Sequence, residues 1–295
     1  MPDFESLLYR FERSISVLGR SKSTFENYAR HIASISLHYG KIPAELDPEQ
    51  IHEYLFMLQK RSKTPSQTYF KHTVYGLRFL LKTEGLAYSF LQLPEIKQDK
   101  KLPVVLSKEE VWAMLQHCTL LKHKILIGLL YGCGLRCMEV RSLRLADLDF
   151  DRQQVKVVQG KGKKDRYVPL SSHLIRGLKT YISVEKPQDY LFGGQIQGRA
   201  GGDFDSRYSQ KGVQWAVKEA AKRAGIRKSV CVHTLRHTFA THLLEDGLDI
   251  ISLKDLLGHE NIETTMLYLH IAQNGRLKPF SPLDTLFAQC KPGSK

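Results

Sequence analysis

Residues 232–270 read VHTLRHTFATHLLEDGLDIISLKDLLGHENIETTMLYLH, and this stretch decides both the fold and the chemistry of the chain. Apolar residues recur in it at helical spacing, and Gly247 and Gly258 interrupt the pattern, so we expect three successive helices. Asp249 is a suitable N-cap for the second of them. Packing alone does not account for four polar residues, which are candidate site residues: His233, Arg236, His259 and Tyr268.

The first of these helices carries a candidate anion site. Its buried side is predicted to consist of Leu235, Phe239, His242 and Leu243. His233 and Arg236 are three residues apart, so both project from one side of the first turn. The helix dipole and the free N–H groups there favour a phosphate. A zinc-protease site is excluded because HTLRH lacks the glutamate of the HExxH motif.

The second and third helices add one candidate each. His259 follows the glycine that ends the second helix, which places its imidazole at a fixed corner. In the third helix we expect Ile262, Met266 and Leu269 to face the core. Tyr268 then lies off that side and can expose its phenol. Taken alone, such a tyrosine is usually an ordinary surface residue.

An arginine follows a strongly apolar helix. Residues 123–131 are almost wholly apolar, which predicts a buried helix, and a glycine-rich turn then leads to Arg136. A guanidinium held near the core needs an anion, because burying an unpaired charge is costly. The local sequence leaves two kinds of partner open: an external phosphate, or Glu139 or Asp147 in a structural ion pair.

Residues 148–170 predict a small β-sheet with strands in DLDF, QQVKVVQ and DRYVPL. The turn before the last strand reads GKGKK and places Lys161 near its tip. This lysine could enter a DNA groove and bring its ammonium to a sugar-phosphate oxygen. A solvated hairpin that is merely basic fits the local sequence equally well. Beyond the sheet, residues 213–224 predict a helix with Trp215 and Val217 as core candidates.

The N-terminal part predicts a bundle of four short amphipathic helices, near residues 4–18, 24–39, 48–58 and 65–83. Its basic faces could line a DNA duplex or could be ordinary solvated faces. We expect a domain over residues 1–97, a linker over residues 98–106 and a second domain over residues 107–295. Two prolines around a lysine-rich run indicate the linker.

Composition favours a polyanionic partner. The 295 residues carry a formal net charge of +14, with 42% hydrophobic and 25% charged residues. A basic excess of this size suits a protein that neutralises phosphates. The five cysteines have no framework spacing, so we expect reduced thiols in a cytoplasmic protein, and the Cys133–Cys137 pair lacks the second pair of a zinc site. No apolar run approaches the ~18 residues of a membrane span.

The order of these motifs resembles the tyrosine recombinase family, which includes phage integrases and Xer proteins. The motifs are GLR at Arg136, GKG at Lys161, HTLRHTFATHLL at His233 and Arg236, and LLGHENIETTMLYLH at His259 and Tyr268. The resemblance implies a mainly α fold with a small β-sheet: a four-helix core-binding bundle, then a mixed α/β catalytic domain. It implies a site-specific recombinase or integrase that cleaves and rejoins double-stranded DNA through a 3′-phosphotyrosine.

The same resemblance implies a role for each matched residue. Tyr268 would be the nucleophile, Arg136 and Arg236 would bind the phosphate oxygens, and Lys161 would protonate the leaving 5′-oxygen. His233 and His259 would donate hydrogen bonds to the phosphate or help to move the tyrosine proton. No metal and no other cofactor is implied, because two arginines and a lysine can supply the charge stabilisation that phosphoryl transfer needs.

The resemblance also implies a homotetramer on two paired recombination sites, with strand exchange through a Holliday junction. The tail, residues 272–295, would pack on a neighbouring subunit, or on its own domain. Two alternative functions remain open: a type IB topoisomerase-like enzyme, and a non-catalytic DNA-binding module. No motif identifies the recombination site, any accessory protein, or the setting, whether chromosome dimer resolution or integration of a phage, integron or transposon.

Overall fold

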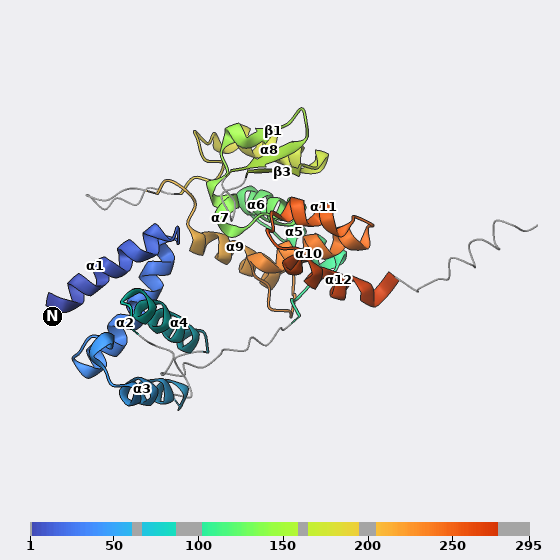
Figure 1. The fold of residues 1–295 in the computed structure, drawn as a ribbon. Helices are drawn as coiled ribbons and strands as arrows, with labels where there is room; N and C mark the ends of the chain where they lie inside the picture. The colour runs from blue at the N-terminus through green and yellow to red at the C-terminus, as the bar shows by residue number, and fades with distance from the viewer. Residues whose placement is uncertain (1, 61–66, 87–101, 159–164, 195–204, 277–295) are drawn as a thin grey trace, which may run out of the picture. The chain divides into compact units, whose positions relative to one another are not determined.

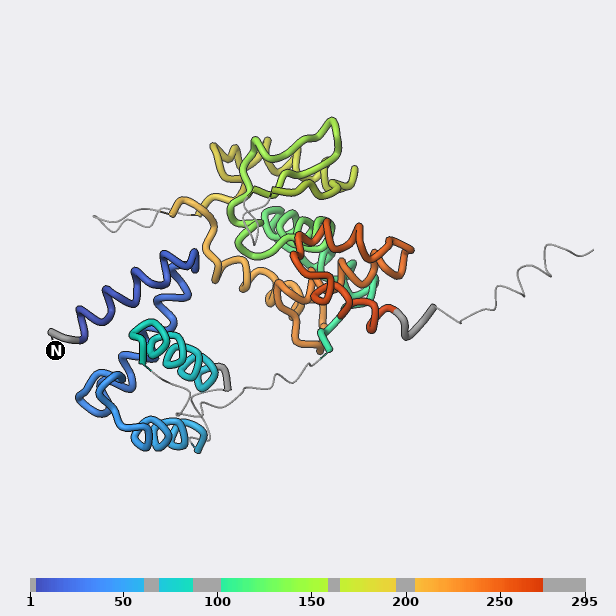
Figure 2. The backbone as a smooth tube through the Cα atoms, in the orientation of Figure 1, coloured from blue at the N-terminus to red at the C-terminus, as the bar shows by residue number. Residues whose placement is uncertain are grey.

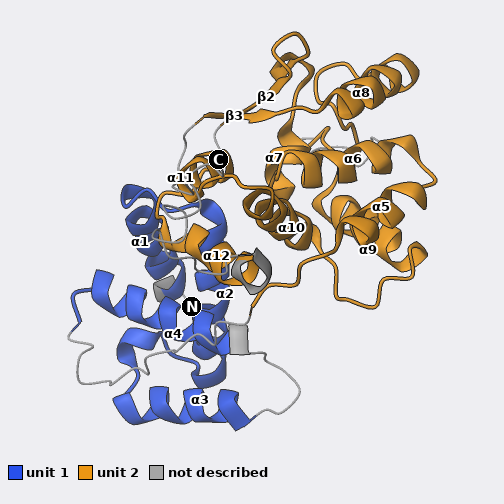
Figure 3. Cartoon of the chain, turned by 90° about the vertical axis from the view of Figure 1, so that its right-hand side faces the viewer, with its two compact units in different colours: residues 1–100 blue, residues 101–295 orange. Residues whose placement is uncertain are grey.

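The computed structural model describes residues 2–60, 67–86, 102–158, 165–194 and 205–276 (Figures 1 and 2). The chain divides into two compact units, residues 1–100 and residues 101–295 (Figure 3). Each unit has its own apolar core. None of the helices in the described ranges has the length and apolar character that crossing a membrane requires.

The described part of the first unit is a helical bundle, as predicted. Its helices are α1 (Pro2–Val17), α2 (Lys22–Tyr39), α3 (Pro48–Lys60) and α4 (Gln67–Thr83), with a short 3-10 helix at Pro43–Glu45. Ser21 caps α2, and Gly40 ends it in the left-handed conformation at φ 67°. Buried side chains of α1, α2 and α4 share one cluster: Leu7, Phe11, Ile15, Ile32 and Leu80.

The second unit begins with three helices and a small sheet. The helices are α5 (Lys108–Gln116), α6 (Leu121–Gly132) and α7 (Cys137–Ser142), followed by a 3-10 turn at Leu145–Asp147. The strands β1 (Leu148–Asp149), β2 (Gln154–Val157) and β3 (Arg166–Pro169) are antiparallel in the order β1-β2-β3. Val155 lies opposite Val168, and both are buried, so one face of the sheet belongs to the core.

The rest of the second unit is helical. It contains α8 (Ser172–Glu185), α9 (Gln210–Arg223), α10 (Val232–Glu245), α11 (Ile250–Leu257) and α12 (Glu263–Arg276). In Figure 1, the sheet and α8 lie on one side of this unit, α10, α11 and α12 gather on the other, and α6 lies between. The strongly apolar α6 fits this place because Leu126, Leu129 and Leu130 are fully buried.

The chain before α5 is anchored to α10. The backbone N–H of Leu106 donates to Thr238 Oγ1 over 3.1 Å, and the side chain of Leu106 is buried. Ser107 and Glu110 form a capping box at the start of α5. The predicted linker residues 98–101 lie outside the described residues, as does the tail from residue 277 onwards.

Two predicted core positions are wrong. Trp215 is 54% exposed, because α9 buries a stripe of smaller side chains that includes Val213 and Val217. Met266 is 44% exposed, because α12 is turned so that Thr265 and Tyr268 face inward. The hydroxyls of Thr265 and Tyr268 form hydrogen bonds with residues outside α12, and these bonds offset the cost of burying the two hydroxyls. Apolar periodicity could not reveal these partners.

Candidate active site

Arg236 lies at the centre of the candidate site. It is in the second turn of α10 and only 3% exposed. Its Nη1 donates to the carbonyl oxygen of Gly134 over 2.6 Å, and its Nη2 donates to that of Leu257. Burial and the charge of Arg136 lower the pKa of Arg236 to about 10, so the guanidinium stays charged at neutral pH. The side chain thus ties the turn before α7 to the end of α11.

Arg136 is held by the first residues of α7. Its backbone N–H donates to Glu139 Oε2 and its Nη1 to Glu139 Oε1, both over 2.8 Å. The same carboxylate accepts two hydrogen bonds, of 2.9 and 2.8 Å, from Arg166 on β3. Burial would raise the pKa of Glu139, but the hydrogen bonds and charge of Arg166 and the bonds from Arg136 lower it to about 2.

His259 occupies the predicted corner after α11. Gly258 ends this helix at φ 61°, a left-handed conformation that favours glycine. His259 Nε2 lies 3.2 Å from Arg236 Nη2, and His259 Nδ1 lies 2.9 Å from Thr265 Oγ1. Because a guanidinium can only donate, Nε2 accepts, and Nδ1 carries the proton that is donated to the threonine. The imidazole is therefore neutral and fixed in one tautomer in this arrangement.

Tyr268 is buried, and the prediction that its phenol is exposed is wrong. Only 3% of the residue is exposed, and its Oη lies 2.9 Å from Nδ1 of His237 on α10. Burial raises the pKa of Tyr268, while the positive charges of Arg236 and Arg136 act in the opposite direction. The helix that carries the phenol packs against α10.

His233 stands at the exposed start of α10, three residues before Arg236. Partial burial of the ring and the charges of Arg236 and Arg136 lower its pKa. The imidazole is therefore mostly neutral at neutral pH and can donate one hydrogen bond to an anion.

A cavity of about 290 Å³ lies where these groups meet. Its lining consists of Arg136, His233, Arg236, His237, Gly258, His259, Glu260, Asn261, Thr264 and Tyr268. The two guanidinium groups in this lining provide the paired donors that a phosphate prefers. Glu139 is matched by Arg166, so the positive charge of these guanidinium groups is not cancelled. A phosphate in this cavity would lie beside a phenol.

The structure thus brings five of the six predicted residues to one cavity, from the N-cap of α7, from α10, from the segment after α11 and from α12. The sixth, Lys161, lies outside the described residues. Sequence reasoning missed the supporting residues His237, Arg166 and Thr265, and it named Glu139 as one possible structural partner of Arg136. Of the three missed residues, only His237 gave a signal, because it directly follows Arg236 within the motif. In the described ranges, His, Cys, Asp and Glu side chains form no group of three placed to hold a metal ion.

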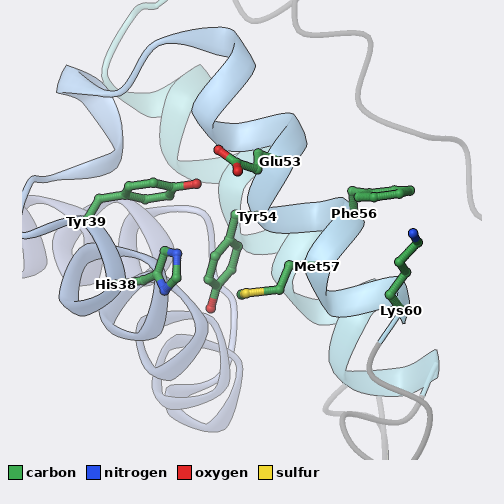
Figure 4. Close-up of a pocket in the computed structure, with 7 residues that line it drawn as sticks. All are labelled: His38, Tyr39, Glu53, Tyr54, Phe56, Met57 and Lys60. Carbon is green, nitrogen blue, oxygen red and sulfur yellow. The ribbon is translucent and has the colours of Figure 1, made fainter.

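A second cavity, of about 580 Å³, lies between α2 and α3 in the first unit (Figure 4). It is lined by His38, Tyr39, Glu53, Tyr54, Phe56, Met57 and Lys60. The rings pack on one another, with the centroids of His38 and Tyr39 4.6 Å apart. Its formal charges are one carboxylate and one ammonium, so it lacks the concentrated positive charge of the first cavity.

Comparisons with known proteins show which sequences and folds the chain is similar to. The family model of the phage integrase family matches residues 104–274, and that of the phage integrase N-terminal SAM-like domain matches residues 7–83. A tyrosine recombinase of Pseudothermotoga lettingae is 35% identical over 250 residues, covering 79% of this chain and 81% of that protein. The tyrosine recombinase XerA of Thermococcus onnurineus is 32% identical over 274 residues, covering 92% and 93%.

A solved structure shares the fold. The crystal structure of XerH site-specific recombinase, bound to a palindromic difH substrate, matches with a TM-score of 0.67 over 85% of this chain and 77% of that chain. The sequence identity is 21%, so this likeness concerns the fold.

Proposed function

The chain belongs to the phage integrase family of tyrosine recombinases, and from this premise we propose that Tyr268 is the nucleophile with which it cuts and rejoins DNA. Membership makes the chain a site-specific DNA recombinase and disfavours the topoisomerase-like and non-catalytic alternatives. One observation carries the proposal: the buried Tyr268 lines the same cavity as Arg136 and Arg236. A phosphate bound to the guanidinium groups would have the phenol as its neighbour.

In the proposed reaction, the Tyr268 oxygen attacks the scissile phosphorus while the bond to the 5′-oxygen breaks. The products are a 3′-phosphotyrosine and a free 5′-hydroxyl. Arg136 and Arg236 bind the non-bridging oxygens and stabilise the charge that develops on them. Attack by the 5′-hydroxyl of a partner strand reverses the chemistry. The phosphotyrosine stores the energy of the broken phosphodiester bond, so resealing needs no ATP.

The other predicted residues complete this scheme. His233 donates a hydrogen bond to the phosphate from the exposed side of the cavity. His259, whose Nε2 accepts from Arg236, helps to orient that guanidinium and can help to move the phenol proton. Lys161 protonates the leaving 5′-oxygen, a role that rests on the sequence resemblance alone.

The proposed assembly follows from the family. The fold resembles XerH, whose structure contains its difH substrate, and the basic chain suits DNA as a partner. We assign core binding of DNA to residues 1–97, and catalysis together with further DNA contacts to residues 107–295, joined by the linker. A homotetramer would exchange strands between two paired sites through a Holliday junction, in the cytoplasm.

A covalent trap tests the nucleophile. The protein is incubated with supercoiled DNA that carries its own genomic neighbourhood, the mixture is denatured, and DNA that stays attached is sequenced. We expect adducts at DNA 3′ ends that disappear in Tyr268→Phe. Tyr131→Phe is the matched control, because its phenol also lies 2.9 Å from a histidine Nδ1, that of His242, but outside the cavity. Adducts that persist in Tyr268→Phe would show that another residue attacks.

A further inference from the structure

Two histidines of α10 each form a hydrogen bond with a tyrosine of another helix, and one of these two pairs connects structural elements away from the cavity. Tyr131 Oη lies 2.9 Å from His242 Nδ1, and His242 Nε2 lies 3.0 Å from the carbonyl oxygen of Leu106. The carbonyl can only accept, so Nε2–H donates to it, and in the neutral form of the ring Nδ1 accepts from the tyrosine. This pair joins α6 and the chain before α5 to α10.

The second pair faces the cavity. Tyr268 Oη lies 2.9 Å from His237 Nδ1, and both side chains line the cavity that holds Arg136 and Arg236. Only 3% of the surface of Tyr268 is exposed, and burying its hydroxyl without a hydrogen bond would be costly. A hydrogen bond from the hydroxyl to His237 on the neighbouring helix satisfies the hydroxyl and also restricts where its oxygen can lie.

We propose that His237 is a positioning residue for the nucleophile: its Nδ1 accepts the hydrogen bond of the Tyr268 phenol and holds the oxygen beside the two arginines of the cavity. This inference rests on the proposed role of Tyr268. A nucleophile held within reach of the bound phosphate reacts without first being ordered, and such positioning is a large part of catalysis.

The protonation states agree with a positioning role. Burial, followed by the charges of His233 and Arg236, lowers the pKa of His237 to about 4, so the imidazole is neutral at neutral pH and can accept. A base this weak leaves the phenol protonated in the resting protein, since burial raises the pKa of Tyr268. His237 therefore orients the oxygen, and the proton leaves only during attack.

The test compares two substitutions at one position. In His237→Asn, the amide Oδ1 occupies nearly the place of Nδ1, so the hydrogen bond is retained without a titrating ring. His237→Ala removes it. We expect His237→Ala to slow single-turnover cleavage of a nicked duplex substrate about a hundred-fold at unchanged DNA affinity. His237→Asn should recover most of that loss, and Tyr131→Phe should cleave at the wild-type rate.

Three outcomes would overturn the inference or its premise. Wild-type cleavage by His237→Ala, while Tyr268→Phe is inactive, removes the positioning role but keeps the nucleophile. Equal loss in His237→Asn and His237→Ala assigns a titrating function to the ring. Adducts in Tyr268→Phe refute the proposed nucleophile itself.

If His237→Ala folds poorly, its cleavage rate does not report on positioning, so a second measurement observes the phenol directly. Fluorotyrosine placed at position 268 reports the surroundings of the phenol by ¹⁹F NMR. We expect a single sharp resonance in the wild type and in His237→Asn. A broadened or shifted resonance is expected in His237→Ala and not in Tyr131→Phe. An unchanged resonance in His237→Ala would contradict the role.

Discussion

A single buried carboxylate allows three arginines to lie close together. Glu139 faces Arg166 at 2.8 Å, Arg136 at 2.8 Å and Arg236 at 3.9 Å. One negative charge opposite three guanidinium groups leaves an excess of positive charge, which a phosphate would neutralise. Arg166 also donates to the carbonyl oxygen of Leu256 over 2.8 Å, so the same cluster fixes the end of α11.

Replacing this carboxylate should change the acid stability of the protein. The folded pKa of Glu139 is about 2 and its ordinary value is 4.5, so its contribution is complete above pH 4.5 and is lost as the pH falls towards 2. The difference corresponds to about 3 kcal/mol. We expect Glu139→Gln to lower the free energy of unfolding at neutral pH by this order and to flatten its decline in acid.

Urea denaturation of both proteins across this pH window measures the effect. Glu219→Gln is the control, because Glu219 pairs with Arg223 on the surface of α9 and surface pairs contribute little. If Glu139→Gln lost stability in acid as steeply as the wild type does, another group would be responsible.

For individual residues, the sequence identified the charged side chains of the site better than it predicted their contacts and burial. It left open whether Arg136 meets a phosphate or Glu139, and the structure shows a guanidinium bonded to Glu139 that also lines the cavity. It predicted an exposed Tyr268, because apolar periodicity cannot foresee that His237, 31 positions away, offers a hydrogen bond. Partners contributed by other elements depend on tertiary packing.

Among the elements, the turn between α6 and α7 is the most tightly constrained part of the site. Gly134 has φ +60°, and a Cβ at this position would overlap the ring of Phe239. Its carbonyl oxygen accepts from Arg236 over 2.6 Å. Close approach of this backbone to α10 therefore needs glycine, for both its conformation and its size.

A matched pair of substitutions separates conformation from size. Gly225 also has a left-handed backbone, with φ +70°, but a Cβ there would meet nothing within 4 Å. We expect Gly225→Ala to cost about 1 kcal/mol of unfolding free energy, from backbone strain alone. Gly134→Ala should cost about 3 kcal/mol or more, because overpacking adds to the strain. Equal losses in urea denaturation would mean that Phe239 moves aside freely.

Helix ends were predictable where a local signal marks them. The N-cap Asp249 and the left-handed Gly258, which ends α11, both have the predicted roles. The helix α8 was not predicted, although Ser171 caps it. The predicted buried side of α12 was wrong. Packing against α10 and α11, rather than the helix's own apolar residues, determines which side is buried.

In the whole molecule, the net positive charge is divided unevenly between the two units. Residues 1–100 contain 14 Lys/Arg and 11 Asp/Glu, a net charge of +3. The totals of 44 and 30 leave 30 and 19 for residues 101–295, a net charge of +11. Composition alone thus favours a polyanionic partner and places most of the excess positive charge in the second unit, but it does not identify which basic side chains touch phosphates.

This asymmetry predicts how DNA affinity depends on salt. Cationic side chains release counterions from DNA, so affinity falls as a power of salt concentration. With Tyr268→Phe to prevent covalent trapping, we expect binding of a random duplex to weaken about 10³-fold or more between ~50 and ~200 mM salt. Residues 101–295 alone should retain most of the logarithmic slope, and residues 1–100 alone should show a shallower one. Fluorescence anisotropy titrations of the three proteins measure these slopes. A steeper slope for residues 1–100 would mean that a few well-placed cations of the bundle, rather than the net charge of the catalytic unit, dominate the grip on DNA.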